Sequence, residues 1–202
     1  MDRQPILVWS ESPGHEADGV VVSLAGLADA LRTHPDQLVL AEIVSPFGFA
    51  KRQGVDLNEV LRDDPARGEG MLSDFAAKVR DEVALALETG ADGIFYRLDG
   101  AYPAASSPME YGGHFLEIDR ALLSEVRDAR LNILFVEGGE ETYFDCLTDL
   151  PAHVLAWDFA QTGIDVATMR AIRTGALAAP SDDADIRLLR SFDGTLDSLR
   201  DS

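Results

Sequence analysis

The chain has 202 residues, of which 46% are hydrophobic and 26% are charged, and its formal net charge is −19. These values suit one globular domain, and we treat residues 1–202 as a single domain. The acidic excess argues against binding to a nucleic-acid backbone, which needs clustered lysine and arginine. No apolar run approaches the ~20 residues of a membrane span, and the first residues lack the regions of a signal peptide. We therefore expect a cytoplasmic protein with no nucleic-acid or membrane partner.

Apolar runs alternate with amphipathic stretches through the first half of the chain. Phe75, Val79 and Val83 form the apolar stripe of the longest expected helix, which Gly90 ends. In chain order the patterns predict a strand at 5–9, a helix at 20–33, a strand at 38–44, a mainly irregular segment at 47–70 with a short helix at 57–62, a helix at 71–88 and a strand at 93–98.

The second half continues the alternation. It predicts a helix at 108–128, a strand at 132–136, a short helix at 140–150, a strand at 153–157, a helix at 165–173 capped by Asp165, a short strand at 175–179 and a final helix at 185–199. The strands read as continuous apolar runs, which is typical of parallel strands covered on both faces. The sequence therefore predicts an α/β protein with a mainly parallel sheet.

Ligands of parallel α/β sheets bind beyond the carboxyl ends of the strands. That rule selects the candidate site residues. They are His15 after the first strand, Glu42 near the end of the second, Arg97, Asp99 and Tyr102 at and after the end of the third, Glu137 after the fourth, and Trp157 and Asp158 at the end of the fifth.

Glu137 has the best position among these residues. It follows the apolar run 133–136 and precedes Gly138, Gly139 and two further carboxylates. We consider it as a catalytic general base or a ligand of a hard metal ion. Alternatively, it caps the helix expected at 140–150, whose first amides could hold an anion. His15 is the second catalytic candidate, as a loop proton carrier, with a solvated surface histidine as the alternative.

Arg97 interrupts the otherwise apolar run 93–98, so its charge needs a partner. A salt bridge to Glu42 or Glu137 would supply one, and a substrate carboxylate would do the same. Because barrel strands converge, Glu42, Arg97, Glu137 and Asp158 could share one pocket. We expect Trp157 to pack in the core rather than to stack on a substrate.

The order and spacing of several motifs resemble the uroporphyrinogen decarboxylase superfamily, which also contains the cobamide-dependent methyltransferases. The shared features are the Gly-Ala-Asp-Gly strand start at 90–93, the Ser-Pro helix start at 107–108, the strand with a glycine turn at 132–139 and the Trp-Asp strand end at 157–158. The first two strands are similar as well. The resemblance implies a parallel βα barrel of the TIM type.

Members of this superfamily have eight βα units, and about six are recognisable here. The expected barrel is therefore reduced or incomplete. An open barrel would expose strand edges. Superfamily members are dimers, and we expect a homodimer that covers the opening.

The superfamily's functional residues are mostly absent. The arginine-rich N-terminal motif of the decarboxylase is reduced to Arg3, and its essential aspartate maps to no residue. The methyltransferases bind zinc through a His-x-Cys pair, and Phe135 and Glu137 stand at the matching positions. Because Cys146 is the only cysteine, a multi-thiolate zinc site is excluded, and we assign no cofactor.

These observations leave three functions open. The first is a uroporphyrinogen decarboxylase-like enzyme, of the lyase or methyltransferase type, that acts on a small organic acid. The second is a non-catalytic paralogue that binds a small-molecule ligand or a partner. The third is a metal-dependent enzyme that uses the carboxylates of Glu42, Glu137 and Asp158.

Overall fold

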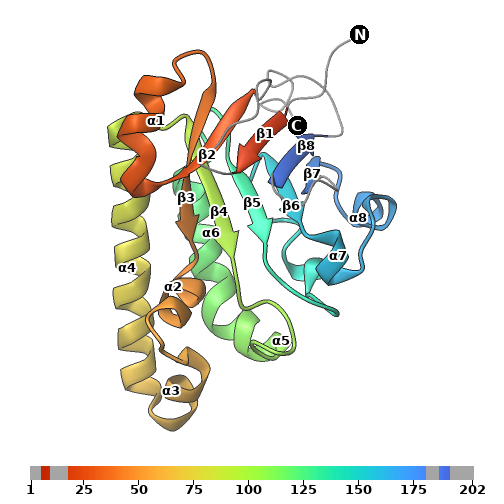
Figure 1. Cartoon of the computed structure of the whole chain (residues 1–202). Coiled ribbons are helices and arrows are strands. Elements are labelled where there is room, and N and C mark those ends of the chain that lie inside the picture. Colours follow the sequence, from red (N-terminus) through yellow and green to blue (C-terminus); the bar gives the residue numbers. More distant parts are fainter. Residues whose placement is uncertain (1–5, 10–17, 181–186, 192–202) are drawn as a thin grey trace.

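The computed structural model describes residues 6–9, 18–180 and 187–191, and its strands form one sheet in chain order (Figure 1). The strands are β1 Ile6–Trp9, β2 Gly19–Ser23, β3 Leu38–Val44, β4 Gly93–Leu98, β5 Ile133–Val136, β6 Val154–Trp157, β7 Ala176–Pro180 and β8 Arg187–Ser191.

The sheet closes into a barrel of the reduced TIM type. Neighbouring strands pair in parallel from β1 through β7, and β8 runs antiparallel to both β7 and β1. The α/β fold class and the parallel sheet predicted from the sequence are confirmed. Because β8 pairs with both of its neighbours, the exposed edges that motivated a dimer are occupied within the chain; the homodimer stays a prediction.

The helices lie outside the sheet, and α4, the longest, runs along β3 and β4 (Figure 1). Within the described part of the chain, none of them combines the length and apolar character that crossing a membrane requires. They are η1 Leu24–Gly26, α1 Leu27–Thr33, α2 Pro46–Arg52, α3 Leu57–Asp63, α4 Pro65–Thr89, α5 Pro108–Glu110, the π-helix η2 Tyr111–Phe115, α6 Leu116–Glu125, η3 Phe144–Cys146, α7 Phe159–Thr162 and α8 Val166–Ile172.

The sheet separates two hydrophobic cores. One lies between the strands and the surrounding helices, and the other fills the barrel. Within the barrel the rings of Phe95 and Phe135 stack with centroids 5.5 Å apart. The remaining members of the inner core are Val21, Leu38, Leu40, Leu131, Ile133, Val154, Ala156, Ala176 and Ala178. Alternate residues of the strands β2 to β7 therefore point inward, as the pleat requires.

The predicted helix at 20–33 is wrong in its first third. Val20, Val21 and Val22 belong to β2, and the α-helix begins only at Leu27. Three successive β-branched residues lose side-chain freedom in a helix and favour a strand. The apolar spacing that suggested a longer helix continues from β2 into α1.

The segment before the long helix is more helical than expected. α2 occupies much of the stretch assigned as irregular, and α4 begins at Pro65 rather than near Met71. Asp64 is the N-cap of α4, and its side chain accepts a hydrogen bond from the backbone N–H of Arg67. A capping aspartate followed by proline is a regular helix start, but Gly68 and Gly70 obscured it in the sequence.

Two other predicted helices are wrong. The segment 140–150 contains only the single 3-10 turn of η3, and Glu141 has a left-handed backbone with φ of 62°. Residues 187–191 of the expected final helix form β8, and the rest of that helix lies outside the described residues. The expected strands 38–44 and 93–98 coincide with β3 and β4.

Candidate functional site at the carboxyl ends of the strands

Three neighbouring strands bring polar side chains to the carboxyl end of the barrel interior. Glu42 follows the inward Leu40 by two residues on β3, Arg97 follows Phe95 on β4, and Glu137 follows Phe135 beyond the end of β5. Because side chains alternate along a strand, these three residues form the polar layer above the apolar filling. We call Glu42, Arg97 and Glu137 the mouth cluster.

The mouth cluster is joined by ion pairs. The Nη1 atom of Arg97 donates to Oε1 of Glu42 at 2.9 Å, and its Nη2 atom pairs with Oε1 of Glu137. The side chains of Arg97, Glu42 and Glu137 are 22%, 20% and 27% exposed, so water reaches all three. Glu42 also forms an ion pair with Arg52 of α2, whose Nη2 atom donates to Oε1 of Glu42 at 3.3 Å. Both salt bridges considered for Arg97 in the sequence are present together.

The electrostatics keep the arginine charged. Burial lowers the pKa of Arg97, but the hydrogen bonds and negative charges of Glu42 and Glu137 outweigh burial and leave that pKa raised. Two carboxylates share one guanidinium, so the cluster itself carries a net negative charge. Arg52 at the rim offsets this charge only partly, because its side chain is 54% exposed.

Asp158 and Trp157 serve local structure at the end of β6. The Asp158 carboxylate is the N-cap of α7 and accepts hydrogen bonds from the backbone N–H groups of Ala160, at 2.9 Å, and Gln161, at 3.2 Å. The Trp157 ring is fully buried, and its Nε1 donates to the carbonyl oxygen of Ile164 at 2.8 Å. The contacts of these two residues thus serve the α7 turn and the core.

The carboxylates of Glu42, Glu137 and Asp158 do not assemble into a metal site. Across residues 18–178, whose side chains are described, no group of three histidine, cysteine, aspartate or glutamate side chains is close enough to hold a metal ion. Glu42 and Glu137 each direct an oxygen to Arg97, and Asp158 caps a helix. His15, the other catalytic candidate, lies outside the described residues.

The turn after β5 also differs from the expectation. No helix starts at Glu140, so the anion site expected at its first amides is absent among the described residues of this turn. The turn is tight instead, since a Cβ on Gly138 would lie 2.1 Å from Oγ1 of Thr142. That hydroxyl donates to the carbonyl oxygen of Gly139 at 2.8 Å. The backbone N–H of Glu137 donates to the carbonyl oxygen of Leu98. This hydrogen bond holds the start of the turn against β4.

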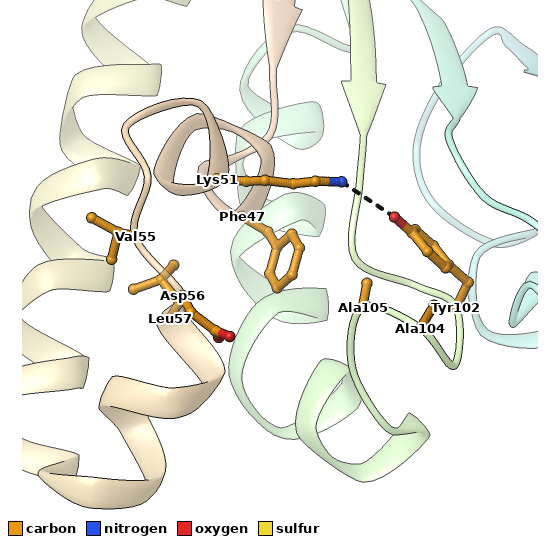
Figure 2. Close-up of a pocket in the computed structure, with 8 residues that line it drawn as sticks. All are labelled: Phe47, Lys51, Val55, Asp56, Leu57, Tyr102, Ala104 and Ala105. Carbon is orange, nitrogen blue, oxygen red and sulfur yellow. Dashed lines mark hydrogen bonds between the residues drawn. The ribbon is translucent and has the colours of Figure 1, made fainter.

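Tyr102 lines a second recess, which we call the side pocket, and the buried Asp99 contacts its lining residue Lys51. The side pocket has a volume of about 270 Å³, and its walls include Phe47, Lys51, Val55, Leu57, Tyr102 and Ala105 (Figure 2). Lys51 closes one end of it. Its Nζ donates to Oδ2 of Asp99 at 2.8 Å and to the Tyr102 hydroxyl at 3.2 Å.

Lys51 was missed in the sequence because its segment was assigned as irregular. The structure places it in α2, which Ser45 begins. The Ser45 hydroxyl accepts hydrogen bonds from the backbone N–H of Gly48, at 3.3 Å, and from that of Asp99, at 3.2 Å. Ser45 thereby fastens the start of α2 to the end of β4. The Ser-Pro pair at 45–46, a regular N-cap followed by proline, was the available signal.

A second missed residue is a carboxylate on the outer face of the sheet. Asp119 of α6 is 1% exposed and accepts hydrogen bonds from the hydroxyls of Tyr96, at 2.6 Å, and Tyr111, at 2.7 Å. Burial raises the pKa of Asp119 to about 6, against the opposing effect of the two hydroxyls. We call these three residues the buried acid cluster. Asp119 stands four residues after Phe115 and three before Leu122, on the apolar face of the helix, and that spacing was the signal.

Comparison with known proteins supports the architecture. No protein-family model matches the sequence, and no curated protein matches it. Among solved structures the chain is similar to a methyltransferase from Methanosarcina mazei, with a TM-score of 0.65 and 17% sequence identity. The likeness covers 80% of this chain and 48% of the methyltransferase chain, so this chain spans about half the length of that structure. At this identity the likeness shows the fold alone, which is an α/β barrel.

Proposed function

We propose that the protein binds a small organic acid at the mouth cluster, as a methyltransferase-like or uroporphyrinogen decarboxylase-like barrel of reduced size. The observation that carries the proposal is the position of Arg97. Its charged guanidinium stands in the interior polar layer at the carboxyl ends of the strands, where ligands of parallel barrels bind, and water reaches it.

The chemistry of the cluster favours an acid that also carries a hydrogen-bond donor. A ligand carboxylate can form a bidentate pair with Arg97 in place of Glu42 or Glu137. The displaced glutamate then needs a donor, and a ligand ammonium or hydroxyl group supplies it. A lone carboxylate would instead add a third negative group to the cluster. The proposed ligand class is therefore a small amino or hydroxy acid.

Glu137 is the proposed proton acceptor of this site, because its partly exposed carboxylate lies where the bound ligand would be held. Methyl transfer and decarboxylation are the reactions to assay. Non-catalytic ligand binding is the competing function, and the same experiments separate the two.

The first test is a titration of the protein with glycine, lactate and succinate, followed by calorimetry. We expect glycine or lactate to bind, and Arg97→Gln to weaken that binding by at least about tenfold, since a charge-assisted bidentate contact is lost. Arg52→Gln is the matched control at the rim and should change the affinity by less than about threefold. Absence of binding at 20 mM, or equal binding by Arg97→Gln, would refute the proposal.

The second test uses ¹³C-labelled forms of whichever acid binds. Release of labelled CO₂, or appearance or loss of a labelled methyl group, that depends on Glu137 would support an enzyme. Binding without turnover in the presence of added methyl donors would instead support the non-catalytic function.

A further inference from the structure

We propose that the side pocket is a separate binding site for a small aromatic carboxylate, with Lys51 as the residue that holds the carboxylate. The site lies beside the barrel mouth and does not include Arg97, so it does not depend on the function proposed for the mouth cluster.

The shape of the side pocket suits one ring with one small substituent. Its volume of about 270 Å³ corresponds to the space of about nine water-sized groups. Figure 2 shows the Phe47 ring beneath the Lys51–Tyr102 hydrogen bond, with Val55 and Leu57 on one side and Ala105 on the other. The middle of the pocket is thus apolar, the polar groups of Lys51 and Tyr102 stand together at its upper end, and the Asp56 carboxylate lies at its lower end.

The Phe47 ring is held in place from two sides. It makes an edge-to-face contact with Phe115, with ring centroids 5.1 Å apart. On another side it is covered by Gly100, whose φ is +105°, and a Cβ there would lie 2.8 Å from the Phe47 Cγ atom. A ring held this firmly offers a preformed surface, which lowers the ordering cost of binding a second ring.

Lys51 retains the capacity to bind an anion. An ammonium group has three N–H donors, and among the described residues its acceptors are Oδ2 of Asp99 and the hydroxyl of Tyr102. The Lys51 side chain is 57% exposed, while Asp99 is buried. A ligand carboxylate can therefore accept the third N–H without breaking the pair with Asp99. Burial lowers the pKa of Lys51, but its contacts with Asp99 and Tyr102 raise it overall, so the ammonium stays charged at neutral pH.

The surrounding carboxylates are already occupied. Asp99 accepts from Lys51 and from the backbone N–H of Gly100, at 2.7 Å. Asp56 lies at the opposite end of the pocket from the Lys51 ammonium (Figure 2) and accepts from the backbone N–H of Glu59 at 3.0 Å as the N-cap of α3. The Lys51 ammonium and the apolar side chains of Phe47 and Leu57 therefore match the carboxylate and the ring of an aromatic acid.

The probe for this site is benzoate, followed through the backbone amide signals of the isotope-labelled full chain. Benzyl alcohol keeps the ring without the charge, and acetate keeps the charge without the ring. We expect benzoate to bind at millimolar concentration, to shift signals near Phe47 and Tyr102, and to bind about tenfold more tightly than either of the other probes.

Two neighbouring residues of α2 provide matched variants. Lys51→Met should weaken benzoate binding about tenfold, and Lys51→Arg should restore most of it. Arg52→Met removes an adjacent charge that faces Glu42 instead, and it should leave benzoate binding unchanged.

The proposal is overturned by any of three results. These are no benzoate binding up to 20 mM, equal binding by Lys51→Met, or signal changes confined to Arg97 and Glu137. The last result would place benzoate in the mouth cluster. Conversely, absence of both glycine and lactate binding with intact benzoate binding would refute the mouth function alone, so the two failures are distinguishable.

Discussion

Consecutive residues of β4 belong to the two clusters of ionisable groups. Arg97 points into the barrel, where it forms ion pairs with Glu42 and Glu137 beside water, whereas the hydroxyl of Tyr96, which points outward, donates a hydrogen bond to the fully buried Asp119. In the mouth cluster, two carboxylates pair with the positive charge of Arg97. In the buried acid cluster, the carboxyl group of Asp119 accepts hydrogen bonds from two neutral hydroxyls. The difference teaches that burial raises the pKa of a carboxyl group sealed behind the sheet with neutral hydroxyls as partners, whereas the carboxylates at the barrel mouth are reached by water and pair with an arginine.

The largest expected difference between the clusters is the response to pH. Asp119 has an ordinary pKa of 3.8 and a folded-state pKa of about 6. Between these values the folded chain binds more protons than the unfolded chain, so its free energy of unfolding decreases as the pH rises. The total decrease is about 3 kcal/mol and is complete above pH 6.

Urea unfolding of the native chain and of Asp119→Asn between pH 4 and pH 7.5 measures this effect. Asparagine does not titrate, so the difference between the two chains isolates Asp119 from the other carboxylates. A difference that stays constant over this range would show that Asp119 ionises in the fold as it does in water.

Arg97→Met should produce the next largest effect. The substitution leaves the carboxylates of Glu42 and Glu137 together without their shared cation, and we expect the free energy of unfolding at pH 7 to fall by about 2 kcal/mol, since the cluster is only partly buried. Arg52→Met is the control, with an expected loss below about 0.5 kcal/mol for an exposed pair. Equal losses in the two variants would mean that the mouth cluster behaves as an ordinary surface network.

The smallest expected difference between the two clusters is the effect of salt on the free energy of unfolding of their variants. At 1 M NaCl the screening length is about 3 Å, so we expect the cost of Arg97→Met to fall by roughly 0.5 kcal/mol. The difference between the native chain and Asp119→Asn at pH 7.5 should not change, because ions do not reach a fully buried group. A salt dependence of the second difference would indicate that water enters the buried acid cluster.

The strands of the barrel were predictable because their composition and their position agree. β3 and β4 have continuous apolar runs bounded by clear turn residues, and the interruptions at Glu42 and Arg97 pointed to their pairing. β2 and β8 were not recognised, since a short strand that leads directly into a helix, or carries arginine at both ends of its apolar pair, does not show strand periodicity.

The site residues were predictable only where their position along a strand determines where the side chain points. Arg97, Glu42 and Glu137 follow from alternation along adjacent strands. The role of Lys51 depends on α2 forming and on Ser45 joining it to β4, a contact between residues more than fifty positions apart. Asp158 shared the strand-end position of the others, but its side chain caps its own helix, and local hydrogen bonds of this kind compete with long-range pairing.

The interior of the barrel distributes its volume unevenly. Phe95 and Phe135 fill it from β4 and β5, while β6 and β7 contribute smaller side chains, Val154, Ala156, Ala176 and Ala178. For protein engineering, the barrel is therefore a scaffold in which a cavity for a small molecule can be made by shortening one side chain. Shortening Phe135 to alanine would open a chamber beneath Arg97, and enlarging one of the facing alanines would set its size, so a guest molecule could be chosen by two side chains while the ion-paired roof above them stayed the same.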